Sequence, residues 1–310
     1  METSPVPKLS QFGETLNKAI STITQSRRRD FVITSAAGSA RSLFISLLAE
    51  QSDAPLLVVA DTYEIAELFR QDLAFYLPED RLQFFPHWDT IPYDNQSPDK
   101  EVVALRFQTL TQILNQTAKV TVTTVNALMR YIMPPSVFAA HCFTIQEAES
   151  YDREDLLHRL VNMGYVRVDL VEDKGEFSVR GEIIDLFPVT ESNPLRLDFF
   201  DDELESIKYF DVESQRSMDP KKAFSVLPAQ EVIYDDAFHQ QCLDRLNAIK
   251  ADTVPQVFNF TVDQLRSKIS YPGIESLLPL FYPETATLLD YFNEPPRVIY
   301  LEKDAVQEHA

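Results

Sequence analysis

The stretch Pro55-Leu56-Leu57-Val58-Val59-Ala60 decides the fold class of this 310-residue chain. A short, continuous apolar run is typical of a strand that is buried on both faces, as in a parallel sheet. Asp61 and Thr62 close the run, and residues 63–75 then carry apolar side chains at helical spacing. The sequence therefore predicts a strand followed by a helix, which is the repeating unit of an α/β domain.

The same alternation of strands and helices continues in both directions from this unit. Similar apolar runs predict strands at 31–33, 82–85 and 120–122, and helical spacing predicts helices at 42–51, 100–114 and 126–132. Strands that alternate with helices form right-handed crossovers and a parallel sheet. Residues 1–29 are predicted to form an amphipathic helical arm that ends in Arg27-Arg28-Arg29.

The pattern changes after about Pro135. One helix is predicted at 149–163, and strands then follow one another directly at 165–171, 176–187, 195–200 and 207–212. Short polar connections between consecutive strands indicate an antiparallel meander in a small α+β domain. Helices return after about Ala229, and residues 297–301 predict another buried strand. The sequence therefore predicts an α/β domain that is interrupted by the meander and then resumed.

Composition and charge exclude several classes of function. The formal net charge is -20, and so acidic a surface repels phosphate chains, which argues against a stand-alone nucleic-acid binder. No apolar run approaches the ~18 residues of a membrane span, and the polar N-terminus does not resemble a secretory signal. Cys142 and Cys242 lack the spacing of metal ligands or of a disulfide framework, which favours a cytoplasmic location.

The segment after the first predicted strand lies where a phosphate-binding P-loop would lie. A P-loop needs Gly, four residues, and then Gly-Lys-Ser/Thr. Here Ser35 and Ala40 take the glycine positions, Arg41 the lysine position and Ser42 the magnesium-ligand position, with Gly38 between them. Side chains at the glycine positions obstruct the backbone wrapping that holds a phosphate, and arginine is bulkier than lysine. The sequence predicts a degenerate loop that does not hydrolyse ATP, with a weak anion site as the alternative.

Other catalytic constellations are not evident in the sequence. The histidines His87, His141 and His158 lack metal-ligand spacing. No nucleophile-elbow motif and no Cys/His pair occurs. Neither catalytic residues nor a metal site is therefore predicted.

Strands alternate sides with a period of two residues, which places charged residues on one face of the predicted meander. The members of this face are Arg167, Asp169, Arg180, Glu182, Arg196, Asp198 and Lys208. The opposite, apolar face is predicted to hold Val166, Val168, Leu170, Phe177, Val179, Ile183, Leu195, Leu197, Phe199, Ile207 and Tyr209. Gly181 introduces the alternative of a bulge that shifts the register after it.

Two interpretations of the charged face stay open. One is a solvated sheet surface with cross-strand ion pairs worth ~0.2–1 kcal/mol each. The other is a surface that docks a partner, because arginine is favoured at interface hot spots and mixed charges give specificity.

Two runs within the meander carry a resemblance to known proteins. The run GEFSVRGEIIDLFP at 175–188 and the run LRLDFFDDE at 195–203 resemble the second domain of the repair helicase UvrB. They resemble still more closely the N-terminal UvrB-homology module of bacterial transcription-repair coupling factors, the Mfd family. Supporting segments lie at 85–94, 210–216 and 272–275.

The resemblance implies a RecA-like parallel-sheet domain with a degenerate P-loop and an inserted UvrA-binding domain. It implies three segments: residues 1–140 as the first part of the RecA-like domain (1A-like), 141–229 as the inserted domain (domain 2-like), and 230–310 as the continuation (1B-like). The UvrA-contacting charges of the family fall on Arg167, Arg180, Arg196 and Asp198. One further arginine of UvrB falls on Ser178, so that contact is not expected here.

The implied function is that of a non-catalytic adaptor, which recruits UvrA in transcription-coupled nucleotide excision repair. The full-length family protein is an ATP-dependent DNA translocase, and RNA polymerase, DNA, ATP and magnesium are expected to bind domains beyond this segment. No cofactor and no membrane partner are therefore expected here. The alternative is a UvrB-like, ATP-dependent protein that binds damaged DNA. The loop at 86–98 argues against it, because Trp88 and Tyr93 are its only aromatic residues and a stacking platform needs several.

Overall fold

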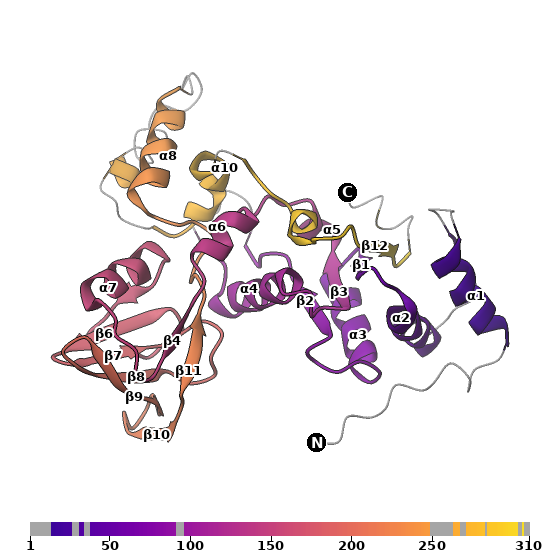
Figure 1. The fold of residues 1–310 in the computed structure, drawn as a ribbon. Coiled ribbons are helices and arrows are strands. Elements are labelled where there is room, and N and C mark those ends of the chain that lie inside the picture. The colour runs from indigo at the N-terminus through magenta and orange to yellow at the C-terminus, as the bar shows by residue number, and fades with distance from the viewer. Residues whose placement is uncertain are drawn as a thin grey trace. The chain divides into compact units, whose positions relative to one another are not determined.

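The computed structural model describes residues 14–26, 31–33, 38–90, 96–248, 263–266, 271–282, 284–302 and 306. The chain divides into two compact units (Figure 1). The first unit comprises 1–87, 108–130 and 288–310, and the second comprises 88–107 and 131–287. No helix within the described residues is long and apolar enough to cross a membrane. The predicted three-segment division into 1–140, 141–229 and 230–310 stays a prediction.

The first unit is built on a four-stranded parallel sheet in the order β12-β1-β3-β2. Its strands are β1 (Leu56–Ala60), β2 (Leu82–Phe85), β3 (Val120–Thr124) and β12 (Arg297–Tyr300). Every residue of β1 and β3 is buried, as expected for central strands of a parallel sheet. The predicted parallel sheet is confirmed, and a strand from the far end of the chain joins it as predicted. That strand lies at an edge, however, and exposes Val298 and Tyr300.

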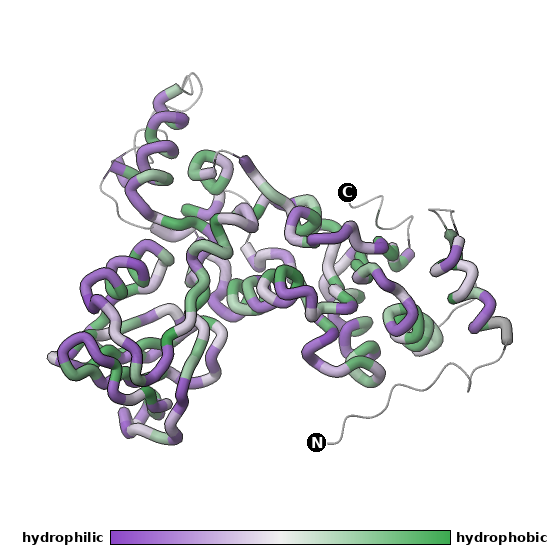
Figure 2. Tube along the Cα trace, in the orientation of Figure 1, coloured by the Kyte–Doolittle hydropathy of each residue, from purple (hydrophilic) through white to green (hydrophobic). Residues whose placement is uncertain are grey.

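Helices accompany this sheet in the first unit. They are α1 (Glu14–Gln25), α2 (Ser39–Gln51), α3 (Tyr63–Ala74), α5 (Val125–Leu128), the 3-10 helix η3 (Leu288–Tyr291), and the last part of α4 (Lys100–Leu114). The hydroxyl of Thr62 caps α3 by accepting a hydrogen bond from the backbone N–H of Ile65. Leu47 of α2, Val58 of β1 and Leu73 of α3 meet in one core cluster. Figure 2 shows hydrophobic residues along α2 and α4.

The predicted strand at 31–33 is wrong. These residues have no strand structure, and Val32 and Ile33 expose 87% and 48% of their surface. A strand is stabilised by pairing and by packing against neighbours. Within the described residues, β1 pairs only with β12 and β3, so the short apolar run lacks a pairing partner. The arginine triplet at 27–29 lies outside the described residues.

The second unit contains a six-stranded sheet in the order β10-β9-β8-β7-β6-β5. Its strands are β5 (Val166–Arg167), β6 (Glu176–Arg180), β7 (Ile183–Leu186), β8 (Leu195–Phe200), β9 (Glu203–Phe210) and β10 (Ser217–Pro220). Neighbours from β6 to β10 are antiparallel, which confirms the predicted meander. The other elements of this unit are α6 (Pro135–Ala140), β4 (Phe143–Gln146), α7 (Arg153–Asn162), β11 (Ala223–Val226), α8 (Asp236–Ala248), η2 (Ile274–Leu277) and α10 (Leu278–Phe281).

The single strand predicted at 176–187 is a hairpin. A two-residue turn, Gly181-Glu182, separates β6 from β7, and Gly181 has a φ of +61°. Positive φ at the start of such a turn suits glycine, because glycine has no Cβ to clash. The turn pairs Arg180 directly with Ile183. Ile183 therefore lies on the face of Arg180, and its predicted place beside Phe177 is wrong.

The strand predicted at 165–171 is reduced to the two residues of β5, which pair in parallel with β6. Val166 and Leu170 are exposed, so their predicted burial is wrong. The chain leaves the sheet after β5, and Val168 packs against a small apolar cluster of Val171, Phe187 and Phe210.

A buried ion pair lies elsewhere in the second unit. The Arg106 Nε donates to the Glu231 Oε1 at 2.6 Å, and the two side chains are 0% and 2% exposed. The indole Nε1 of Trp88 donates to the same oxygen at 2.9 Å. This cluster joins segments that are far apart in the sequence, because Trp88 and Arg106 precede the meander and Glu231 follows it.

Candidate functional site

Strand register divides the residues of the six-stranded sheet between two faces. One face is apolar and carries Phe177, Val179, Ile184, Leu186, Leu195, Leu197 and Ile207. The other is named the polar face here; it carries one cross-strand row of Ser178, Asp185, Arg196 and Lys208 and a second row of Arg180, Ile183, Asp198 and Ser206. Arg180 and Lys208 are exposed on the polar face, whereas Ser178 and Asp185 are buried.

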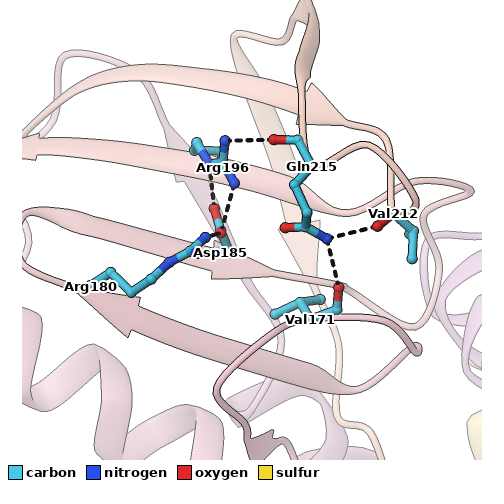
Figure 3. Close-up of polar contacts among 6 residues, drawn as sticks. All are labelled: Val171, Arg180, Asp185, Arg196, Val212 and Gln215. Atoms are coloured by element: carbon cyan, nitrogen blue, oxygen red, sulfur yellow. Dashed lines mark hydrogen bonds and ion pairs between the residues drawn. The ribbon is translucent and has the colours of Figure 1, made fainter.

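Asp185 organises the polar face. Its side chain is 1% exposed, and it receives hydrogen bonds from two arginines (Figure 3). The Arg196 Nε donates to Oδ1 at 2.7 Å and the Arg196 Nη2 donates to Oδ2 at 2.9 Å, while the Arg180 Nη2 also donates to Oδ2. A bidentate arginine–carboxylate pair is strong and fixes geometry. One buried carboxylate therefore holds two guanidinium groups together.

Arg196 is enclosed rather than projecting outward. Besides Asp185, its guanidinium donates from Nη1 to the Gln215 carbonyl at 3.2 Å and lies 4.8 Å from the centre of the Phe210 ring. Gln215 is held in turn by hydrogen bonds from its Nε2 to the Val212 carbonyl at 2.8 Å and to the Val171 carbonyl (Figure 3). The Arg196 side chain is only 19% exposed, so it lies on the polar face but is largely enclosed there.

The electrostatics of Arg196 follow from these contacts. Hydrogen bonding to Asp185 raises the pKa of Arg196 above its ordinary value, and the negative charges of Asp185 and Asp198 add to that rise, against the lowering effect of burial. Arg196 is therefore a fixed cation. Arg180 differs from it, because its side chain is 49% exposed.

The structure brings three of the four predicted partner-binding residues to one face. Arg180, Arg196 and Asp198 share the polar face, and Asp198 lies half-buried between Ile183 and Ser206. Arg167 does not join them, because its register pairs it with Phe177 and thus places it on the opposite face. The expectation that all four share a face is wrong for Arg167. The cause is the short, parallel β5, whose register differs from that of a meander strand.

Asp185 was not predicted as a site residue. The alternation rule, applied to one continuous strand, assigns the residues after Gly181 to the wrong faces. A two-residue turn at Gly181-Glu182 is the signal that would have found it. With that turn, Asp185 lies across from Ser178 and next to the Arg180 side chain.

The described part of the loop predicted to be a degenerate P-loop makes contacts within the first unit. Gly38 has a φ of +54° just before α2, and Ala40 and Arg41 follow in the first turn. The Arg41 Nη1 lies 3.2 Å from the Glu302 Oε1. Ser42 is fully buried, and its hydroxyl donates to the Ser39 carbonyl at 3.0 Å. Ser35 lies outside the described residues. Within the described residues, no group of three or more His, Cys, Asp and Glu side chains could hold a metal ion.

Comparisons with known proteins agree with the resemblance drawn from the sequence motifs. Residues 143–232 match the family described as the UvrB interaction domain. The chain is 32% identical over 273 residues to a transcription-repair-coupling factor of Haemophilus influenzae, which covers 86% of this chain and 23% of the relative. The corresponding proteins of Myxococcus xanthus and Escherichia coli are 35% and 33% identical, over 88% and 82% of this chain and 24% and 22% of their own lengths.

The chain thus spans about a quarter of the length of these curated relatives. The matched family covers β4 to β11 and so includes the whole polar face. Similarity outside that span extends over most of the first unit. The predicted resemblance is confirmed: residues 143–232 match the UvrB interaction domain, and most of the chain is similar to transcription-repair-coupling factors.

Proposed function

We propose that this chain is a non-catalytic adaptor that binds UvrA through the polar face in transcription-coupled nucleotide excision repair. The observation that carries the proposal is the pair of arginines fixed on one buried carboxylate within the UvrB interaction domain. Arg180, Arg196 and Asp198 are proposed to form the binding surface on this face, with Arg196 largely enclosed within it, and Arg167 is proposed to contact UvrA from the sheet edge. A formal net charge of -20 makes such a local cluster of cations stand out.

The chemistry of the polar face suggests what the partner surface must offer. Arg180 offers exposed N–H donors, and Asp198 offers a carboxylate two cross-strand positions away. Ile183 lies between them as an apolar contact. A complementary surface would place a carboxylate opposite Arg180 and a donor opposite Asp198, because such pairing sets specificity and orientation. RNA polymerase and DNA are proposed to bind parts of the full-length protein that correspond to the remainder of the relatives.

Replacing Arg180 by alanine is expected to weaken UvrA binding by at least about tenfold, because arginine is a frequent hot-spot residue and this one is exposed. Titration calorimetry with purified UvrA measures the change. Arg81→Ala is the matched control, since it removes one partly exposed, ion-paired arginine from the first unit. Equal affinities for both variants and the wild type would contradict the proposal. Urea denaturation checks that Arg180→Ala stays folded, as expected while Arg196 still pairs with Asp185.

We propose that the loop before α2 does not bind nucleotides. Titration of the chain with ATP and magnesium is expected to give no saturable heat. The hydroxyl of Ser42 already donates to the helix backbone, and Arg41 pairs with Glu302. An intact P-loop ATPase measured in parallel serves as the positive control. Saturable binding of ATP would instead favour the UvrB-like ATPase and damage-binding alternative. With no nucleotide held, the adaptor needs no cofactor, and we propose that it acts in the cytoplasm.

A further inference from the structure

We propose that Asp185 is a positioning residue that holds the Arg180 guanidinium in place for contact with UvrA. Arg196 supports this arrangement by fixing the Asp185 carboxylate. The inference rests on the proposed function, because it assigns separate tasks to residues of the polar face. Asp185 itself is 1% exposed and cannot offer its carboxylate to a protein surface.

The sheet register explains how one carboxylate reaches both arginines. Asp185 lies on β7, between β6 and β8, and Arg196 is its direct cross-strand neighbour. Arg180 lies two residues beyond Ser178, the direct neighbour of Asp185 on the other side, and so is its diagonal neighbour. Diagonal neighbours are ~7–8 Å apart at the backbone, a distance that a long side chain spans. Arg180 therefore lies along the sheet with its guanidinium at Asp185.

The two arginines differ in what they have left to offer. Arg196 uses Nε and Nη2 on Asp185 and Nη1 on the Gln215 carbonyl, and the Phe210 ring lies under its guanidinium. Arg180 gives one nitrogen, Nη2, to Asp185 and keeps about half of its side chain in solvent. Arg180 is thus the arginine that can contact a partner while it stays held.

Charge balance supports the same division. Two guanidinium groups close together repel each other, and the shared carboxylate compensates for that repulsion while leaving one positive charge on the face. Without the carboxylate, the Arg180 side chain would sample many rotamers and would have to be ordered when UvrA binds. Ordering a side chain in the free protein improves affinity, because its conformational entropy is then not lost when the partner binds.

A double-mutant cycle tests the inference with UvrA as the probe. Asp185→Asn, Arg180→Ala and the double variant are titrated with UvrA. Asp185→Asn is expected to lower affinity about tenfold in the wild-type background and less than twofold when Arg180 is already alanine. Asp198→Asn is the matched control, since it removes the same charge from the same face and is expected to lower affinity equally in both backgrounds. If the effect of Asp185→Asn is equal in both backgrounds, Asp185 has a merely structural role and the inference is overturned.

A second measurement needs neither a variant nor UvrA. In nitrogen NMR spectra of the wild-type chain, the Arg180 guanidinium is expected to show separate, slowly exchanging Nη signals, unlike exposed Arg216. An averaged Arg180 signal like that of Arg216 would overturn the inference, even if Asp185→Asn failed to fold. Wild-type chain that does not bind UvrA would instead refute the proposed function, while the NMR result still decides whether Asp185 holds Arg180.

Discussion

Glu231→Gln is expected to lower the free energy of unfolding by about 3–5 kcal/mol. The substitution keeps the size of the side chain and an oxygen that can still accept from Trp88 and Arg106. It removes the negative charge that compensates Arg106, whose side chain is fully buried. A buried charge that loses its partner keeps its desolvation cost without the attraction that offset it.

Urea denaturation measures this change, and the fluorescence of Trp88 reports it directly. Trp88 is the single tryptophan of the chain, is buried, and donates its indole N–H to Glu231. Glu101→Gln is the control, because Glu101 pairs with Lys174 but is 66% exposed. Its loss is expected to change stability by less than about 1 kcal/mol. Similar losses in the two variants would show that the Arg106–Glu231 pair is not buried in solution.

Leu197→Ala is expected to cost about 2–5 kcal/mol of unfolding free energy. Leu197 lies on β8, is fully buried, and is paired with Ile184 on one side and Ile207 on the other. Truncation leaves a cavity that these neighbours fill only in part, because they are fixed by the strands on either side. Denaturation followed by circular dichroism measures the loss.

Phe200→Ala provides a control on the same strand. Phe200 is a larger apolar residue, but 70% of its surface is exposed. Its replacement is expected to change stability by less than about 0.5 kcal/mol. If Phe200→Ala costs as much as Leu197→Ala, the assignment of the two faces of the sheet is wrong.

Much of the first unit could be predicted from the sequence because its signals are local. The run at 56–60 is continuous and apolar, and the spacing in 100–114 is clearly helical; β1 and α4 lie where these patterns predict. The failure at 31–33 is different in kind. An apolar run indicates only that a segment would be a stable strand if other elements paired with it and buried it. The run does not specify which elements those are.

The polar face shows the other limit of sequence reasoning. Alternation identified Arg180, Arg196 and Asp198 as neighbours on one face, which the register confirms. The contacts of Asp185 with Arg180 and Arg196 depend on the register of three strands, and the two-residue turn at Gly181-Glu182 sets the register of β7 against β6. A shift of one residue reverses every side chain that follows. Ile183 and Asp185 were therefore misplaced or missed together, whereas Arg167 was misplaced because β5 is short and parallel.

The place of β12 has a consequence for biosynthesis. β1 pairs on one side with β3, a close neighbour in the sequence, and on the other with β12, which the ribosome makes only after the entire meander. Contacts between distant parts of a chain form late, because a long loop must close first. During translation, the UvrB interaction domain can finish folding while β1 of the four-stranded sheet is still unpaired on the side that β12 later occupies. The four-stranded sheet, which begins before the meander in the sequence, is thus completed after it.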